Sequence, residues 1–405
     1  MKTLLVISGG VEAVAGIQLA KSMNLHVVVS DMNPAAPAFA IADDHLLAST
    51  YDVQATVNAA RTYHEKVRPI DGVICVASDV PLTVASVAAT LGLPGISIES
   101  ARLATDKLAM KQRFATDGIQ IPWFSLVNSV EHLKDLAEAP GLPLVIKPVD
   151  SRGARGVLRL TPDVNLDWAY QVAYSHSPTG RVMVEQFLPG PQVSTESLMI
   201  DGVAYTPGFA DRNYEYLERY APHIIENGGQ LPSHLSDSTQ QAVRDLVQKS
   251  ARSMGIHNGV VKGDIVVTDG KPHVIELAAR LSGGYFCTHE IPLSTGVNLV
   301  GAAIRQALGE RVDSAELVPK ENLPVAQRYF FASQGVVKSI EGVDRFAKHP
   351  EVAYLEVRIK PGDRIGPVDS HPARAGVVIT TGDTREAAIS LAVEVANSIK
   401  FVTGE

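Results

Sequence analysis

Two carboxylates, Asp264 and Glu276, lie on opposite sides of a predicted β-hairpin. If a three-residue loop centres on Gly270, the two acids occupy directly opposite positions on one face of that hairpin. Facing carboxylates repel each other unless a cation lies between them, and oxygen ligands favour a hard cation such as Mg²⁺ that bridges phosphates. A register shift of one residue would turn Glu276 to the other face. The pattern predicts a metal site, and two exposed acids on an edge hairpin are the alternative.

Lys147 ends a predicted buried strand, and a loop rich in glycine and arginine follows it from Ser151 to Gly156. A lysine at the end of a buried strand is costly unless it meets an anion. Small loop residues also let backbone N–H groups approach a phosphate closely. The P-loop pattern is absent, so any phosphate site here is of another kind. The segment predicts phosphate binding, with a solvated basic turn as the alternative.

A strand–turn–strand segment from Val184 to Glu196 carries candidate nucleotide contacts. Its first strand breaks at Pro189-Gly190, where free backbone groups could bind the edge of an adenine. Gln192 could reach a ribose hydroxyl. An ordinary strand–turn–strand unit explains the segment equally well.

The stretch from Phe209 to Gly229 is rich in aromatic and ionisable residues and shows little periodicity. Within it, Arg212 could pair with a substrate carboxylate and Glu226 could hold an ammonium group. A solvated polar loop is the alternative.

Composition limits the class of protein. The 405 residues include 45% hydrophobic and 20% charged residues, which is typical of a folded globular protein. A net charge of −8 argues against a general nucleic-acid binder. The two cysteines, Cys75 and Cys287, have no metal-ligand spacing and form no disulfide framework, which favours a reducing compartment. No apolar stretch reaches the ~18 residues that span a membrane, so we expect a cytoplasmic protein without a membrane partner.

The elements that must position these residues fall into three predicted domains. Strand and helix signals alternate over residues 1–98, which predicts a parallel α/β sheet. Residues 99–310 begin with one charged helix over 101–118 and continue with strands and the hairpin. Residues 311–405 read as an α+β domain whose last helix is capped by Asp383. The Gly9-Gly10 turn is not a GxGxxG motif, and we favour a structural turn there over a nucleotide site.

In their order along the chain, these motifs resemble the ATP-grasp superfamily of carboxylate ligases. The hairpin continues as Glu-x-x-x-Arg-x-x-Gly-Gly from Glu276 to Gly284, which is similar to L-amino acid ligases and carnosine-synthase-like enzymes. The resemblance implies an N-terminal preATP-grasp α/β domain, an ATP-grasp domain of two subdomains that clamps ATP, and a C-terminal lid-like α+β domain. Many members carry a metal-binding Asn where this chain has Ala278, which leaves the number of bound metals open.

The resemblance also implies roles for single residues. Two phosphate lysines, a loop covering the phosphates, an adenine hinge and a ribose contact form the implied ATP site: Lys107, Lys147, Ser151, Gly153, Gly156, Glu185, Gln186, Phe187, Leu188 and Gln192. The implied metal ligands are Asp264 and Glu276, and the implied catalytic cations are Arg280 and Lys147. The implied substrate residues are Arg212, Glu226, Ser282, Gly283 and Gly284.

The implied activity is the ATP-dependent joining of a carboxylate to an amine, with ATP and Mg²⁺ as cofactors and small molecules as substrates. Within enzymes, a purine-pathway or biotin-carboxylase-like carboxylase or ligase and a D-Ala–D-Ala-like ligase remain open. From another class, a nucleotide-binding regulatory protein without catalysis remains open, although the intact set of charged residues argues against it. The sequence leaves monomer and homodimer open.

Overall fold

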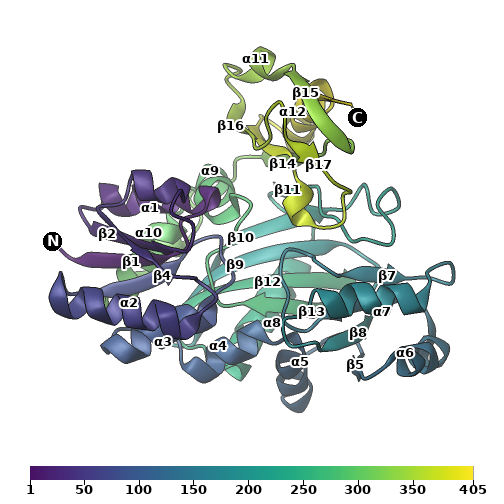
Figure 1. The fold of residues 1–405 in the computed structure, drawn as a ribbon, viewed down its shortest axis with the longest axis horizontal. Coiled ribbons are helices and arrows are strands. Elements are labelled where there is room, and N and C mark those ends of the chain that lie inside the picture. Colours follow the sequence, from purple (N-terminus) through teal and green to yellow (C-terminus); the bar gives the residue numbers. More distant parts are fainter. Residues whose placement is uncertain (405) are drawn as a thin grey trace.

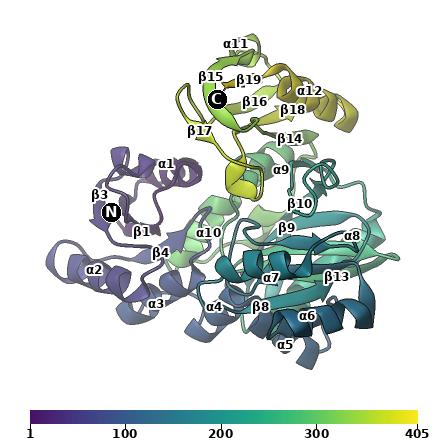
Figure 2. The ribbon, with the colours of Figure 1, turned by 45° about the vertical axis from the view of Figure 1, so that its right-hand side comes forward.

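The computed structural model describes residues 1–404, which form three lobes (Figures 1 and 2). The first lobe holds a parallel four-stranded sheet in the order β3-β2-β1-β4, which confirms the predicted N-terminal α/β fold. Its strands and helices are β1 (Thr3–Ile7), α1 (Val14–Ser22), β2 (His26–Asp31), β3 (Asp44–Leu47), α2 (Val53–Lys66), β4 (Gly72–Cys75) and α3 (Pro81–Leu91).

Both faces of this sheet are covered, which explains its unbroken apolar strands. In β1, Leu4 and Val6 pack in one core with Ile304, while Leu5 and Ile7 pack in another core with α2 and α3. Ile304 belongs to α10 (Leu299–Ala307), a helix from the middle of the chain that packs on α1 and β4. The first lobe therefore completes its core with a segment some 200 residues away in sequence.

The second lobe begins with two helices and a small antiparallel sheet in the order β5-β8-β6-β7. One helix was expected over 101–118, but the chain breaks at Asp106, whose carboxylate accepts a hydrogen bond from the Ala109 N–H at 3.0 Å and caps a second helix. The elements are α4 (Ile98–Thr105), α5 (Lys107–Thr116), β5 (Phe124–Val127), α6 (Val130–Leu136), β6 (Leu144–Pro148), β7 (Leu158–Leu160), α7 (Leu166–Ser175) and β8 (Val182–Gln186).

An eight-stranded sheet forms the centre of the molecule, in the order β13-β12-β9-β10-β11-β14-β18-β16. Helix α8 packs on the half of the sheet that contains β10, β12 and β13. The elements of this half are β9 (Gln192–Ile200), β10 (Val203–Asn213), β11 (Gly228–Leu231), α8 (Asp237–Ser253), β12 (Gly259–Thr268) and β13 (Lys271–Ala278). A short helix, α9 (Ile291–Thr295), then precedes α10.

The third lobe supplies the remaining three strands of that sheet, β14, β18 and β16, so the sheet runs across the predicted boundary at residue 311. Helix α12 packs on β14 and β18, and its cap is Thr384 rather than Asp383, because the Thr384 hydroxyl accepts the Ala387 N–H. The elements are β14 (Val325–Phe330), β15 (Gly335–Glu341), α11 (Val343–Phe346), β16 (Val352–Val357), β17 (Arg364–Ile365), β18 (Gly376–Thr381), α12 (Arg385–Ser398) and β19 (Lys400–Gly404). None of the helices within residues 1–404 has the length and apolar character needed to cross a bilayer.

Candidate active site

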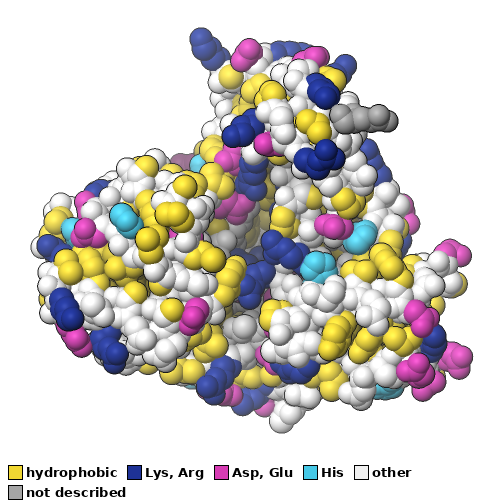
Figure 3. Space-filling view, in the orientation of Figure 1, with side chains coloured by type: hydrophobic (Ala, Val, Ile, Leu, Met, Phe, Trp, Pro, Cys, Tyr) yellow, Lys and Arg dark blue, Asp and Glu magenta, His cyan; other side chains and the backbone are white. Residues whose placement is uncertain are grey.

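A cavity of about 550 Å³ lies where the three lobes meet. Figure 3 shows the hollow at the centre of the molecule, with Lys and Arg side chains gathered inside it. The structure brings every predicted site residue except Gly156 to the wall of this cavity: Lys107, Lys147, Ser151, Gly153, Glu185, Gln186, Phe187, Leu188, Gln192, Arg212, Glu226, Asp264, Glu276, Arg280, Ser282, Gly283 and Gly284. The small antiparallel sheet, the central sheet, helix α5 and the connecting loops therefore contribute residues to one cavity wall.

Gly156 is not among the cavity-lining residues. Its φ of 70° lies in the left-handed region, and a Cβ there would come within 3.0 Å of Pro148 and of His176. Both facts demand glycine for the path of the backbone. Gly156 shapes the end of the loop, while Ser151 and Gly153 line the cavity, and the contact of this loop with phosphate stays a prediction.

The hairpin places Asp264 directly opposite Glu276, as predicted, but by another route. The predicted three-residue loop is wrong: Thr268 pairs with Lys271, so the turn contains only Asp269 and Gly270, both with positive φ. That turn alone would pair Asp264 with Ile275. A β-bulge between Asp264 and Ile265 shifts the register by one residue and restores the pairing with Glu276.

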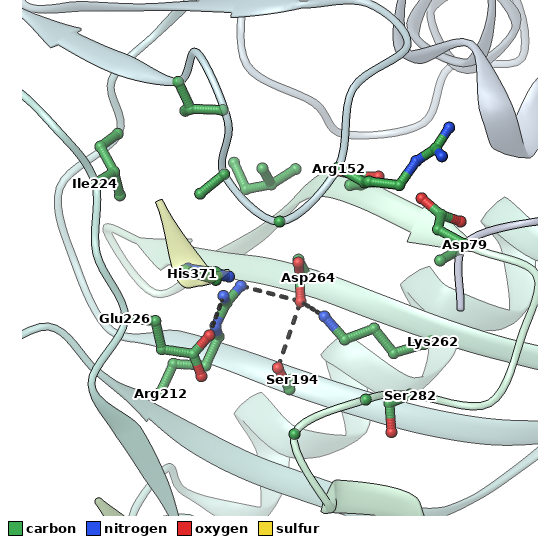
Figure 4. A pocket seen from close by; sticks show the side chains of 18 of the residues that line it. Asp79, Arg152, Ser194, Arg212, Ile224, Glu226, Lys262, Asp264, Ser282 and His371 are labelled. Atoms are coloured by element: carbon green, nitrogen blue, oxygen red, sulfur yellow. Dashed lines mark hydrogen bonds and ion pairs between the residues drawn. The ribbon is translucent and has the colours of Figure 1, made fainter. Parts of the chain in front are cut away.

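Side-chain cations already neutralise the two facing carboxylates. Asp264 forms ion pairs with Lys262 and with Arg212, the latter at 3.0 Å, as Figure 4 shows, and Glu276 pairs with Lys107 at 3.2 Å. Burial raises the pKa of Asp264, but Arg212 and Lys262 lower it further, so the net pKa is well below its usual value. The repulsion from which a metal was expected is thus relieved by the chain itself, and both carboxylates remain available as oxygen donors.

The donor set suits a hard divalent cation that also binds a ligand. No group of three or more His, Cys, Asp or Glu that could hold a metal ion occurs within the described residues 1–404. Ala278, on the same face as Asp264 and Glu276, adds no donor atom. Two carboxylates supply only part of the six oxygens that Mg²⁺ prefers. The residues present therefore fit a cation whose remaining ligands are water and phosphate oxygens.

A buried charge cluster lies at the end of β6 and β8. Glu185 binds two lysines, Lys147 at 2.5 Å and Lys111 at 3.0 Å, and all three side chains are buried. Burial lowers the pKa of Lys111 to about 8, despite the opposing effect of Glu185. The Glu185 side chain thus holds Lys147 in place at the cavity wall. Sequence reasoning missed Lys111, whose position on α5 gave no local signal.

The loop over the cavity touches all three lobes. The Lys107 ammonium donates to the Ser151 carbonyl at 2.8 Å, and the His371 N–H of the third lobe donates to the Gly153 carbonyl at 3.0 Å. The Arg152 guanidinium lies over the Tyr51 ring of the first lobe, 4.1 Å from its centroid. The loop is therefore held in a closed position by both flanking lobes.

Arg280 faces Asp79, and both retain unused hydrogen-bonding capacity. The Arg280 Nε and the Asp79 Oδ1 are 3.8 Å apart, and within residues 1–404 neither atom has a hydrogen-bond partner although both are buried. Such atoms on a cavity wall are suited to a ligand oxygen or hydroxyl. Sequence reasoning missed Asp79, yet it follows β4 at the carboxyl edge of a parallel sheet, where ligands commonly bind.

Arg212 links the predicted substrate residue Glu226 to Asp264 of the predicted metal pair. It lies on β10 rather than in a loop, and its guanidinium binds Glu226 at 2.6 Å as well as Asp264 (Figure 4). Glu226 is also 3.6 Å from Arg374 of the third lobe. The predicted ammonium-binding carboxylate is therefore already paired with two guanidinium groups.

Further residues reach the cavity from distant parts of the chain without a local sequence signal. Glu12 of the first lobe accepts hydrogen bonds from the Gly284 N–H at 2.7 Å and from Arg358 of the third lobe at 2.6 Å. The others that sequence reasoning missed include Glu290, Gln327, Tyr329, Arg358, His371 and Arg374. Only the assembled fold brings them together.

Comparison with known proteins identifies the family. Residues 104–284 match the model of the ATP-grasp domain, and residues 328–404 match that of the L-amino acid ligase C-terminal domain 2. The chain thus carries an ATP-grasp domain and a C-terminal domain of the L-amino acid ligase type, and these matches support an enzyme that forms a C–N bond. Enzymes of this family bind ATP and form a C–N bond.

Two proteins of known sequence are similar to this chain. The "Uncharacterized protein y4rH" of Sinorhizobium fredii is 27% identical over 340 residues, which cover 82% of this chain and 68% of that protein. A D-alanine–D-alanine ligase of Gloeobacter violaceus is 29% identical over 46% of this chain and 63% of its own length. The match thus spans less than two thirds of that ligase.

Among solved structures, an L-amino acid ligase from Bacillus licheniformis superposes with a TM-score of 0.84 at 22% identity. The superposition covers 100% of this chain and 99% of that one. It confirms the predicted fold over the whole chain, including the N-terminal and C-terminal lobes that flank the ATP-grasp domain.

Proposed function

We propose that this ligase joins the carboxylate of an amino acid to an amine through an acyl phosphate, releasing ADP and phosphate. The observation that carries the proposal is the composition of one cavity wall. Two lysines, a facing pair of carboxylates and Arg280 line it together with charged residues suited to an amino acid. The set contains what each half of such a reaction requires.

In the first half-reaction, a substrate carboxylate oxygen attacks the γ-phosphorus of ATP, and the bond from that phosphorus to the β-phosphate bridge breaks. Lys107 and Lys147 donate hydrogen bonds to phosphate oxygens, and Arg280 stabilises the phosphoryl group in transfer. Glu185 keeps Lys147 directed at the cavity by the ion pair at 2.5 Å. Catalysis on this proposal rests on positioning and charge stabilisation.

Asp264 and Glu276 would hold Mg²⁺, which neutralises charge on the phosphate oxygens when bound. Ion pairs with Arg212, Lys262 and Lys107 hold both carboxylates in the cavity wall, where their oxygens could serve as ligands. When the ligand binds, these cations can turn from the carboxylates to phosphate oxygens without leaving the cavity.

In the second half-reaction, the amine attacks the acyl carbon, a C–N bond forms, and the C–O bond to phosphate breaks. Water would hydrolyse the acyl phosphate, so it must be excluded. The loop 151–156, held by Tyr51 and His371, covers the reacting groups.

The test is a coupled assay of ADP release with ATP, Mg²⁺ and pools of amino acids, followed by mass spectrometry of the products. We expect ADP release that depends on amino acids, with a condensed product. Release that depends instead on bicarbonate would favour a carboxylase. Nucleotide binding without ADP release in any pool would favour a regulatory protein and overturn the proposal.

A further inference from the structure

The carboxylates that line the cavity differ in whether a cation neutralises them. Among the described residues 1–404, eight carboxylates line it, and seven of these form an ion pair with Lys or Arg. The seven pairs are Glu12 with Arg358, Asp79 with Arg280, Glu185 with Lys111 and Lys147, Asp211 with Arg385, Glu226 with Arg212, Asp264 with Arg212 and Lys262, and Glu276 with Lys107. Glu290 is the eighth, and within residues 1–404 it has no ion pair.

Glu290 is also buried, with 3% of the residue exposed. It ends the π-helical turn Phe286–Glu290, and its carboxylate forms no hydrogen bond with the described residues. A buried carboxylate without a counter-ion is costly in its charged form. An ionised Glu290 would therefore need a positive charge that the described side chains around the cavity do not supply.

The charged groups that shift the pKa of Glu290 belong to the side of the cavity that holds the predicted substrate residue Glu226. They are Glu226, which precedes β11, Arg328 of β14 and Glu196 of β9. Arg328 is directed elsewhere: it donates to the Gln327 carbonyl at 2.7 Å and is 3.8 Å from Glu215. None of the lysines described around the predicted phosphate site contributes to the pKa shift of Glu290. A cation meeting Glu290 would thus come from the organic substrate rather than from the nucleotide site.

We propose that Glu290 binds the protonated primary amine of an amino-acid substrate. This assignment rests on the proposed function and deepens it, because it names the group that distinguishes an amino acid from a simple carboxylic acid. The predicted ammonium contact, Glu226, is less suited, since Arg212 and Arg374 already neutralise it. The cationic amine supplies a counter-ion to Glu290, which alone among the cavity carboxylates of residues 1–404 has none.

Binding in this way has a measurable proton balance. Burial, followed by repulsion from Glu226, raises the pKa of Glu290 to about 8. At pH 7 the free enzyme therefore carries a neutral Glu290 carboxyl group. When an ammonium group binds, Glu290 ionises and its proton passes to solvent, so substrate binding releases nearly one proton.

The first experiment measures that proton. An active amino acid from the ADP-release panel is titrated by calorimetry at pH 7 in two buffers of different ionisation enthalpy, with a non-hydrolysable ATP analogue present. The wild-type enzyme should release nearly one proton per amino acid. Glu290→Gln should release none and should bind the amino acid about tenfold or more weakly. Gln closely matches the protonated carboxyl group in shape, and unchanged affinity for the ATP analogue checks that the variant is folded.

The second experiment removes the amine from the substrate instead. kcat/KM is measured for the amino acid and for the analogue that lacks its amine. The wild type should prefer the amino acid by about tenfold or more, and Glu290→Gln should lose that preference. Glu316→Gln, an exposed acid paired with Arg305 outside the cavity, serves as the matched control and should behave as wild type.

The outcomes separate this assignment from the proposed function. If the wild type is active but Glu290→Gln keeps the same preference and proton release, the amine contact lies elsewhere and the assignment is overturned while the ligase activity stands. If no amino acid gives ADP release with the wild type, the proposed function fails, and this assignment fails with it.

Discussion

The two ends of the cavity treat their charges differently in the absence of ligands. At the end formed by β6 and β8, Glu185 neutralises Lys111 and Lys147, and Lys107 is held by Glu276. At the other end Glu290 has no ion pair with any of the described residues 1–404. The charges of the first end are balanced in the absence of ligand, because each of these lysines is paired with a carboxylate. When phosphate binds, a lysine can leave its carboxylate for a phosphate oxygen. The second end is left incomplete until a positively charged ligand binds.

This difference suggests a division of labour. Because every ATP-grasp ligase must bind the same nucleotide, an internally paired set of charges serves the first end well. Discrimination between substrates is better served by a buried group left unsatisfied, since ligands that fail to satisfy it bear the cost. On this interpretation, Glu290 contributes to selectivity at some cost in stability.

The largest effect is expected from removing a carboxylate of the facing pair. Glu276→Ala should lower kcat by about 10³-fold or more. The substitution removes a ligand of the cation that neutralises the phosphates, and it also removes the partner of Lys107. ADP release and a thermal melt measure activity and fold together. Glu310→Ala, an exposed acid far from the cavity, is the control. Full ADP release by Glu276→Ala would remove this residue from the site.

A smaller effect is expected from the nucleotide lysine. Lys147→Ala should weaken ATP binding by ~1.5–3 kcal/mol, since a charge-assisted contact with phosphate is lost. Calorimetry with a non-hydrolysable analogue measures this, and Lys249→Ala, whose ammonium lies at the surface on the Gly118 carbonyl, provides the comparison. An unchanged affinity would mean that Lys147 serves only to neutralise Glu185.

Arg212 and Glu226 test whether the two ends are coupled. Glu226→Gln should raise KM for the amino acid by about tenfold and leave the Mg²⁺ requirement unchanged. Arg212→Ala should do the same but also lower the half-saturating Mg²⁺ concentration, because it removes a cation that competes for Asp264. ADP release across Mg²⁺ and amino-acid concentrations distinguishes them. Identical profiles for the two variants would mean that Arg212 does not link the ends.

The smallest effect concerns stability. Because the pKa of Glu290 is raised from 4.5 to about 8, the folded protein binds this proton more tightly than the unfolded chain does. The stability due to that proton is present below pH 4.5 and is lost as pH rises through about 8. Glu290→Gln should therefore gain in melting temperature over wild type by roughly 2–4 °C between pH 5 and pH 9. A difference independent of pH, as expected for Glu316→Gln, would contradict an uncompensated acid.

Sequence reasoning predicted the nucleotide end better than the acceptor end, for a physical reason. Lys147, the loop after it and the strand ending at Gln186 are continuous segments, so residue type and strand pattern place them together. Glu12, Glu290 and Arg358 line the same cavity only because three lobes converge there. No local pattern encodes such a contact.

The same limit explains the smaller errors. Asp106 looked like one charged residue within a helix, but its carboxylate caps a new helix and breaks the predicted one. Lys111 sits on that second helix and reaches Glu185 across the space between two elements. The domain boundary at 311 stays a prediction, and the central sheet joins strands from both sides of it. A sequence pattern predicts helices and strands more readily than the contacts they make with elements distant in sequence.

The β-bulge in the hairpin has a consequence for how such proteins change length during evolution. A two-residue turn with a bulge and a three-residue loop without one give the same pairing of Asp264 with Glu276. A deletion in the turn can therefore be offset by an insertion in the strand, several residues away. Because both changes lie between the two acids, the spacing from Asp264 to Glu276 stays constant and the pair keeps facing each other, although the residues between them occupy different positions in the hairpin.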